Sequence, residues 1–189
     1  MSMSSSVSNR ATFGAGCYWG TEKFFKEDFG KKLFPTSNVQ GKVGFMGLTG
    51  KEKENPSYRE VCSGTTGHVE VYELTFEGDD DTYEALCKHF FTFHDPTTLN
   101  RQGNDAGTQY GSVIFYHDEA QKEIATRVKD ELQGLIKSSK VNAYSTSTVT
   151  TAIVPSNTFY AAEAEHQEYL KNQPWGYCNH QYRFQQWPN

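Results

Sequence analysis

Short runs in which hydrophobic and polar residues alternate predict the strands of a sheet. The expected strands cover residues 11–13, 38–46, 69–76, 112–116 and 148–154. In the third of these, one face carries Glu70 followed by Tyr72, Leu74 and Phe76, because side chains alternate sides along a strand. Glu70 therefore begins a row that is otherwise apolar or aromatic. A carboxyl group in such a row is expected to be partly desolvated, which raises its pKa.

Apolar residues spaced three or four positions apart predict the helices. They cover residues 21–29, 82–93, 118–137 and 160–170. The third begins at Asp118, a residue type whose side chain caps a helix by accepting from its first free N–H groups. Residues 47–57 and 95–111 are polar and contain glycine, so both are expected to be loops. The second is longer than a simple connection needs and is a functional candidate.

The first six predicted elements follow the order strand, helix, strand, strand, helix, strand. That order is typical of a split βαβ, ferredoxin-like core. We therefore predict an α+β fold, a two-layer α/β sandwich with an irregular C-terminal tail. No repeat or linker divides the chain, so residues 11–189 are expected to form a single domain. Residues 1–10 are expected to be a disordered tail, and residues 171–189 an irregular tail that carries Cys178.

Composition narrows the class of protein. The chain has 189 residues and is rich in aromatics, with 13 Phe, 11 Tyr and 3 Trp, which favours a packed globular protein. Its net charge is −5 and no basic block occurs, so nucleic acid and anionic membranes are not expected partners. No apolar run reaches membrane-spanning length, and residues 1–10 lack the apolar core of a secretion signal. A cytoplasmic location is therefore expected, with the cysteines largely reduced at rest.

Cys17 lies in the most informative segment, residues 14–20, with the sequence GAGCYWG. Its glycines allow a tight turn that exposes the sulfur. A helix is expected to follow at once, and its positive N-terminal end favours a thiolate. Tyr18 and Trp19 can form the wall of a small apolar pocket. This setting indicates a reactive cysteine. The four cysteines (Cys17, Cys62, Cys87 and Cys178) form no Cys-x-x-Cys pair, so a zinc ribbon or thioredoxin-type motif is absent.

Five segments, in order, resemble the motifs of the class A peptide-methionine sulfoxide reductases. They are residues 16–22 (GCYWGTE), 55–70 (NPSYREVCSG and then GHVE), 95–98 (DPTT), 100–110 (NRQGNDAGTQY) and 165–178 (EHQ and later GYC). The resemblance covers roughly residues 11–185. One short motif carries little weight, but five in the same order indicate membership of this family.

The resemblance implies an oxidoreductase that converts the S epimer of methionine sulfoxide, free or in oxidised proteins, back to methionine, and so a role in protein repair under oxidative stress. It implies that Cys17 attacks the sulfoxide sulfur and that Glu70, assisted by Tyr58 and Tyr110, protonates the oxygen. The residue types fit this chemistry, because a sulfoxide oxygen leaves poorly unless it is protonated. Phenol hydroxyls can hydrogen-bond the oxygen as its charge develops.

The resemblance also implies how substrate is held and how the enzyme is regenerated. Tyr18 and Trp19 would hold the methyl group, and Asp105 would fix the polar part of the substrate. Cys178 matches the resolving cysteine, which forms a redox-active disulfide with Cys17 after a sulfenic acid. Thioredoxin, with thioredoxin reductase and NADPH, would restore the dithiol, and no bound cofactor or metal is implied. The family is mostly monomeric, so a monomer is expected.

The chain departs from the family pattern at several positions. Tyr18 stands where Phe is more usual, which adds a hydroxyl near the methyl pocket. Gly111 replaces a common Arg. Some members carry a second C-terminal cysteine that relays the disulfide outward, whereas residues 179–189 contain no sulfur. Thioredoxin is therefore expected to attack the Cys17–Cys178 disulfide directly.

Other interpretations of these residues stay open. Cys17 could pair with a histidine such as His166 in a hydrolase or transferase. Tyr18 and Trp19 could instead belong to a non-catalytic module that binds methionine-like side chains. Cys62 and Cys87 are more simply explained by packing, whereas Cys178 has no packing explanation and could otherwise be a stray terminal cysteine. The histidines of the motifs lack metal-ligand spacing and are expected to be structural.

Overall fold

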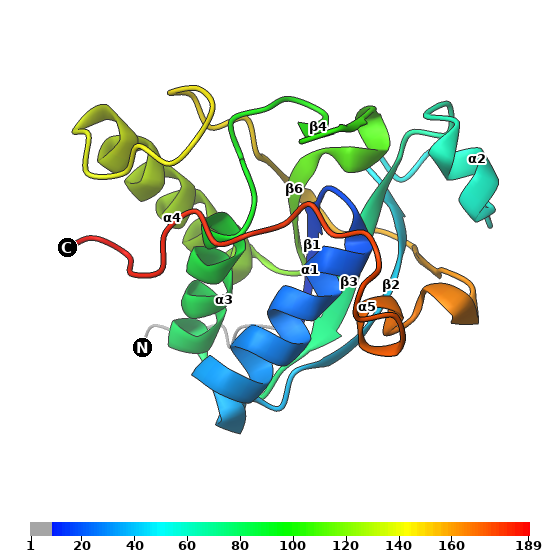
Figure 1. Ribbon diagram of the computed structural model, residues 1–189, viewed down its shortest axis with the longest axis horizontal. Helices are drawn as coiled ribbons and strands as arrows, with labels where there is room; N and C mark the ends of the chain where they lie inside the picture. The colour runs from blue at the N-terminus through cyan, green and yellow to red at the C-terminus, as the bar shows by residue number, and fades with distance from the viewer. Residues whose placement is uncertain (1–8) are drawn as a thin grey trace.

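A six-stranded sheet forms the centre of the computed structural model, which describes residues 9–189 (Figure 1). Its strands are β1 (Arg10–Ala15), β2 (Gln40–Gly47), β3 (His68–Thr75), β6 (Ser112–Tyr116), β7 (Ala152–Pro155) and β8 (Phe159–Ala161). They lie in the order β7-β6-β1-β3-β2-β8, and only β6 and β7 are parallel neighbours. The expected α+β class is therefore confirmed as a mostly antiparallel sheet with helices.

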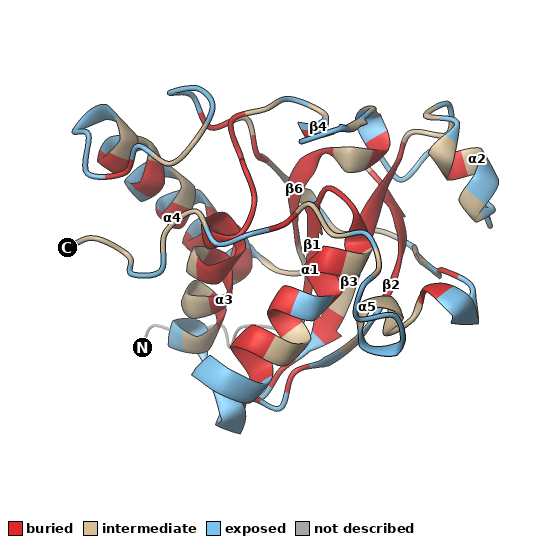
Figure 2. Cartoon of the chain, viewed as in Figure 1, coloured by how far each residue is buried: buried red, intermediate tan, exposed pale blue. Residues whose placement is uncertain are grey.

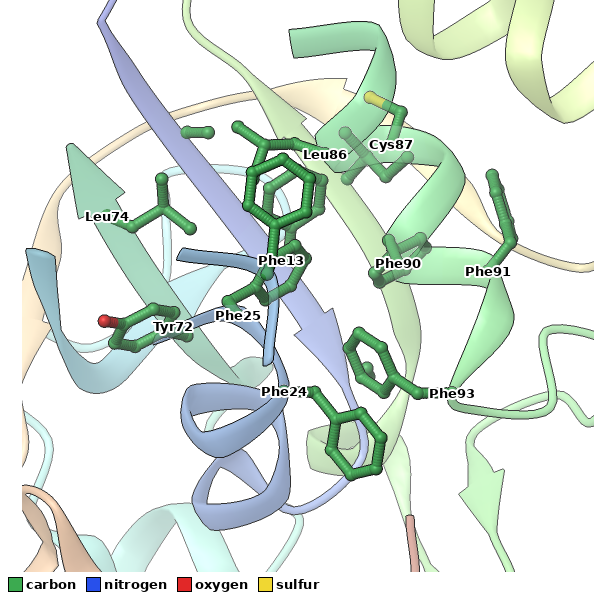
Figure 3. Close-up of a cluster of buried hydrophobic side chains, with 14 of the residues drawn as sticks. Phe13, Phe24, Phe25, Tyr72, Leu74, Leu86, Cys87, Phe90, Phe91 and Phe93 are labelled. Carbon is green, nitrogen blue, oxygen red and sulfur yellow. The ribbon is translucent and has the colours of Figure 1, made fainter. Parts of the chain in front are cut away.

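Three long helical segments pack against one face of this sheet (Figure 1). They are α1 (Tyr18–Lys23) with its π-helical continuation η1 (Phe24–Leu33), α3 (Asp80–Thr92) and α4 (Glu119–Lys137). Their common core is aromatic: the rings of Phe13 and Phe25 stack with centroids 4.6 Å apart, and Phe13 lies 5.3 Å from Phe90 (Figure 3). A smaller cluster that includes Met46 and Val71 covers the opposite face of the sheet. In Figure 2 the central strands and the inner sides of α1 and α3 are mainly buried.

Local capping explains where several helices begin. The Asp118 side chain accepts from the backbone N–H of Gln121 at 2.8 Å, as the sequence predicted for the start of α4. Ser57 and Glu60 form a capping box that starts α2 (Tyr58–Cys62), a short helix that the periodicity did not predict. The first helix begins at Tyr18, three residues earlier than expected. None of the helices within residues 9–189 is both long and apolar enough to cross a membrane.

The predicted helix over residues 160–170 is wrong. This segment contains β8, a 3-10 turn at Ala164–His166 and the short helix α5 (Tyr169–Asn172). The side chain of Gln167 explains the difference, because it accepts from the backbone N–H of Val43 and donates to the Val43 carbonyl, each at 2.9 Å. The edge of β2 thus pairs with β8 and is also hydrogen-bonded to the side-chain amide of Gln167. Apolar residues that resembled a helical face lie here at the edge of the sheet.

The remaining elements are small. The predicted loop over residues 95–111 contains a two-stranded hairpin, β4 (Arg101–Gln102) with β5 (Asp105–Ala106), and a 3-10 turn at Thr108–Tyr110. A further 3-10 turn covers Pro35–Ser37. Of the predicted disordered tail, residues 1–8 lie outside the described residues, whereas Arg10 already pairs with Thr75 in the sheet. Beyond α5, the chain crosses α1 and α3 without forming a helix or strand (Figure 1).

Candidate functional site

Cys17 lies at the turn between β1 and α1, immediately before the first helical residue. Gly16 precedes it with φ +88°, a conformation that favours glycine, and this turns the chain out of the strand. The Cys17 side chain is only 7% exposed. The thiol is thus at a helix N-terminus, as expected, but it is buried rather than open to solvent.

Burial decides the protonation of the Cys17 thiol. It raises the pKa of Cys17 well above the ordinary value, the nearby charge of Glu70 raises it further, and the hydrogen bond from the Trp19 backbone lowers it by less. The backbone at the helix N-terminus thus favours the thiolate, as expected, but burial opposes it more strongly, so the pKa of Cys17 is raised overall. Desolvation exceeds the effect of the helix end, because a buried anion loses the solvation that a partial charge only partly replaces.

Glu70 lies on β3 directly against the start of α1. Its Oε2 accepts the backbone N–H of Tyr18 at 3.1 Å. The residue is 2% exposed, and burial raises the pKa of Glu70 to about 8, against the opposing effect of the Tyr18 hydrogen bond. The expectation of a desolvated carboxyl with a raised pKa is confirmed. At neutral pH this group is mainly a neutral acid, and it is hydrogen-bonded to Tyr18, the residue that follows Cys17 in the chain.

Two phenol groups and a second thiol share the electrostatic surroundings of Glu70. The pKa of Tyr110 is raised by burial and by its interactions with Glu70, Cys62 and Cys17. Burial also raises the pKa of Tyr58, whose hydroxyl is hydrogen-bonded to the Cys62 thiol. The structure therefore brings together the four residues that the motifs placed around the sulfoxide, and Cys62 lies beside them.

An aromatic cluster surrounds the segment after Cys17. The ring of Trp19 stacks on Tyr169 of α5 with centroids 3.8 Å apart, and its indole N–H donates to Nδ1 of His166 at 3.3 Å. The His166 ring lies 4.3 Å from that of Tyr58. His166 is thus engaged with the aromatic wall, which fits the structural role expected for it and does not favour a Cys-His pair. Tyr169 was not predicted, since only tertiary packing brings it to Trp19.

Tyr18 is buried inside this cluster. Its ring lies 6.5 Å from Tyr58 and 5.8 Å from Phe45, and burial strongly raises the pKa of its hydroxyl. The Tyr18 hydroxyl is enclosed and has no hydrogen-bond partner among the described residues. The departure from Phe that the sequence indicated therefore places an unpaired polar atom in an apolar wall, at an energetic cost.

Asp105 joins the hairpin of β4 and β5 to the C-terminal tail. Its Oδ2 accepts from the side-chain amide of Asn179 at 3.0 Å, and the hydroxyl of Tyr177 also bonds to it. Burial raises the pKa of Asp105. Cys178 lies between these two residues of the tail, and its thiol is close enough to contribute to the raised pKa of Cys17. Asn179 and Tyr177 were not predicted as part of the site.

All four cysteines are free thiols in this structure. Cys87 is fully buried in the core between α3 and α4, as expected from its helix face. Cys178 is half-buried, and its Sγ lies 3.9 Å from the carbonyl of His180. Within residues 9–189, no three His, Cys, Asp or Glu side chains are grouped so that they could hold a metal ion.

Comparisons with known proteins point to one family. A family model described as peptide methionine sulfoxide reductase matches residues 9–187. MsrA of Methanothermobacter thermautotrophicus is 44% identical over 169 residues, which is 89% of this chain and 90% of that protein. The reduced form of Mxr1 from Saccharomyces cerevisiae superposes with a TM-score of 0.77 at 33% identity, covering 96% of this chain and 98% of that one. Mxr1 in complex with Trx2 shares the fold at 22% identity and a TM-score of 0.54, over 93% of this chain and 89% of that one.

Proposed function

The chain belongs to the peptide methionine sulfoxide reductase family, and from that premise we propose that it reduces the S epimer of methionine sulfoxide to methionine through Cys17. Members of this family are oxidoreductases. The observation that carries the proposal is the placement of a buried, neutral Glu70 against the residue that follows Cys17. A nucleophilic thiol and a carboxylic acid in one dry site match the needs of sulfoxide reduction.

In the first step, the sulfur of Cys17 attacks the sulfur of the sulfoxide while Glu70 donates its proton to the sulfoxide oxygen. The S–O bond of the substrate and the transient bond between the two sulfurs break as the oxygen passes to Cys17, which becomes a sulfenic acid, and the proton of the Cys17 thiol restores the acid form of Glu70. The sulfoxide is thereby reduced by two electrons and released as methionine, while Cys17 is oxidised by two electrons. Tyr58 and Tyr110, which share the surroundings of Glu70, donate hydrogen bonds to the oxygen as its charge develops.

The proton on Glu70 also affects the nucleophile. An ionised Glu70 raises the pKa of Cys17, so a neutral Glu70 removes one of the two main causes of that rise. Protonated Glu70 therefore assists both reacting groups. It favours the thiolate of Cys17, and it retains the proton that the sulfoxide oxygen needs. The backbone N–H of Trp19 stabilises the same thiolate.

The substrate methyl group is held by the aromatic wall. We assign the contact to the rings of Tyr18 and Trp19, since a sulfur-bound methyl packs well on an aromatic face. Tyr169 supports Trp19 from behind by stacking. Asp105, at the edge of the site beside the tail, is assigned to the polar backbone part of the substrate.

In the second step, the Cys178 thiol attacks the Cys17 sulfenic acid. The S–S bond forms, the S–O bond breaks, and the oxygen leaves as water with the two protons of the reacting groups. Thioredoxin then reduces this disulfide directly and is itself regenerated by thioredoxin reductase and NADPH. The complex of Mxr1 with Trx2 supports a thioredoxin as the reductant. The enzyme is assigned to the repair of oxidised proteins, acts as a monomer and works in the cytoplasm.

We further propose that the core of this fold is ferredoxin-like. Strands β6, β1, β3 and β2 are neighbours in that order, and α1 and α3 are the helices that connect them in the chain. This arrangement supports a ferredoxin-like core within a single catalytic domain over residues 11–189. Strands β7 and β8 extend this core at its two edges.

The proposal is tested by incubating the reduced protein with methionine S-sulfoxide, with and without thioredoxin, thioredoxin reductase and NADPH. We expect about one equivalent of methionine without the reducing system and continuous turnover with it. Cys17→Ser should form no methionine. If the wild type forms none either, the reductase function is refuted, and ester and amide substrates would test the hydrolase alternative.

A further inference from the structure

His180 links the C-terminal tail to the segment that carries the nucleophile. It lies two residues after Cys178, and its Nε2 is 2.6 Å from the carbonyl oxygen of Ala15, which lies two residues before Cys17. We propose that His180 is a positioning residue that holds Cys178 beside Cys17 for disulfide formation. This inference rests on the proposed two-thiol cycle, and it assigns a role to a residue outside the reacting groups.

The hydrogen bond to Ala15 determines which nitrogen of the His180 ring carries the proton. A backbone carbonyl can only accept, so Nε2 must carry the proton that is donated to Ala15. The ring is buried, which lowers the pKa of His180 to about 4, and the imidazole is therefore neutral at physiological pH. The link between the two segments is then an ordinary hydrogen bond in a dry environment, where it is difficult to replace by water.

Gly20 makes room for the ring on the side of α1. A Cβ atom at Gly20 would overlap Nδ1 of His180, and one at Gly16 would meet the Gln102 side chain. On the other side, Phe24 and Phe93 enclose the ring with centroids 6.2 and 5.7 Å away. The helix that follows Cys17 thus leaves a space at Gly20 that the His180 ring fills. Any side chain at Gly20 would occupy that space.

Neighbouring contacts fasten the tail just after Cys178. The side-chain amide of Asn179 donates to the Gln102 carbonyl at 2.7 Å. Further along, the backbone N–H of Gln181 donates to Phe93 and that of Arg183 to Thr92, at 3.3 and 2.7 Å. Before Cys178 the tail is much more open, and Trp175 is 99% exposed. The chain that follows Cys178 is therefore well held, and His180 is one of the residues that hold it.

The position of His180 affects only the second step of the cycle, in which Cys17 and Cys178 form their disulfide. The Cys178 thiol must displace the oxygen of the Cys17 sulfenic acid as water, with formation of the S–S bond. The rate of this step follows the effective concentration of one sulfur at the other, and that concentration is high only if the tail is held nearby. His180 contributes nothing to the attack of Cys17 on the sulfoxide, so the two steps can be separated by experiment.

The first experiment measures the Cys17–Cys178 disulfide at equilibrium in buffers of reduced and oxidised glutathione, and it needs no sulfoxide. We compare His180→Leu, which fills the space without a donor, with His180→Gln, whose amide can donate in place of Nε2. His180→Leu should lower the effective concentration of the thiol pair about tenfold, the order expected for loss of one buried hydrogen bond. His180→Gln should recover most of it, and Gln185→Ala in the exposed tail should change nothing.

Gly20→Ala tests the same contact from the opposite side. Alanine favours a helix more than glycine does, so α1 itself should not be weakened, but the new Cβ must displace His180. We expect a loss of effective concentration similar to that of His180→Leu. A thiol pair that keeps its wild-type equilibrium in both variants would overturn the proposal, whether or not the protein reduces sulfoxides.

The second experiment follows a single turnover with methionine S-sulfoxide and no external reductant. In His180→Leu, methionine should form at the wild-type rate, whereas the disulfide should form about tenfold more slowly. The sulfenic acid should accumulate and be trapped by a 1,3-diketone probe. A merely structural role would slow both steps together, and that result would also contradict the proposal. Failure of the wild type to form methionine would instead refute the reductase function and leave the glutathione result to decide on His180.

Discussion

The backbone N–H of Tyr18 donates to Oε2 of Glu70 at 3.1 Å, although the two residues are 52 positions apart in the chain. This contact holds the acid on β3 against the first turn of α1, immediately after the nucleophile. Because the carboxyl is buried there, its pKa rises to about 8.

Glu70→Gln removes the proton donor and keeps the shape of the side chain. We expect the single-turnover rate of methionine formation to fall between about 100-fold and 10,000-fold, the range for loss of a general acid. In the wild type the rate should fall as the pH rises through about 8, because Glu70 then loses its proton. That decline should be absent in the variant. An unchanged rate at neutral pH would refute the role of Glu70 as acid.

The same substitution should change the pH dependence of stability. The pKa of Glu70 is raised from an ordinary 4.5 to about 8 in the folded protein, so the folded state keeps a proton that the unfolded state has lost. The contribution of Glu70 to stability is therefore complete below about pH 4 and is lost as the pH rises to about 8. Urea denaturation should find Glu70→Gln more stable than the wild type at pH 9. Equal stability at pH 9 would contradict the raised pKa.

Tyr18→Phe removes the enclosed hydroxyl that has no hydrogen-bond partner among the described residues. We expect the free energy of unfolding to rise by about 1 kcal/mol, because a buried unpaired polar group is removed. Tyr144→Phe is the matched control, since the Tyr144 hydroxyl donates to the Phe91 carbonyl at 2.7 Å. The control should lose about 1 kcal/mol in the same urea titration. If both variants lose stability equally, the Tyr18 hydroxyl has a partner.

Tyr169→Ala removes the ring that stacks behind Trp19. We expect the KM for methionine S-sulfoxide to rise between about 2-fold and 10-fold with little change in kcat, because the aromatic wall holds substrate rather than the reacting atoms. Tyr169→Phe keeps the stacked ring and should behave as the wild type in steady-state kinetics. A fall in kcat alone would assign Tyr169 to a different role.

Cys178→Ser should separate the two halves of the redox cycle. The variant should release one equivalent of methionine and then stop with thioredoxin as the only reductant, because the Cys17 sulfenic acid has no second thiol to form the disulfide. Mass spectrometry of the trapped Cys17 would detect the sulfenic acid. Cys87→Ala is the control, since Cys87 lies in the core, and it should keep full turnover while losing stability. Sustained wild-type turnover in Cys178→Ser would remove Cys178 from the cycle.

Much of the site could be predicted from sequence, because its chemistry is encoded in local patterns. The glycines and aromatics around Cys17 indicated a reactive thiol, and alternation along β3 placed Glu70 on an apolar face. The cap at Asp118 and the main strands also follow from short-range rules. By contrast, residues 160–170 were predicted as a helix, because their apolar spacing does not reveal that β2 has a free edge for β8 and Gln167.

The sequence by itself determined which groups can react: one thiol in a tight turn, one carboxyl on an apolar strand face and a second thiol near the end of the chain. Only the tertiary structure decided their protonation and partners. The helix N-terminus favours a thiolate at Cys17, as the sequence indicates, yet burial among residues distant in the chain raises the pKa of Cys17 by more. Likewise, His180 reaches Ala15 across 165 positions. Local patterns specify the residue types and the side of a strand or helix on which each side chain lies. Desolvation and long-range hydrogen bonds depend instead on which segments pack together, and only the folded chain determines that packing.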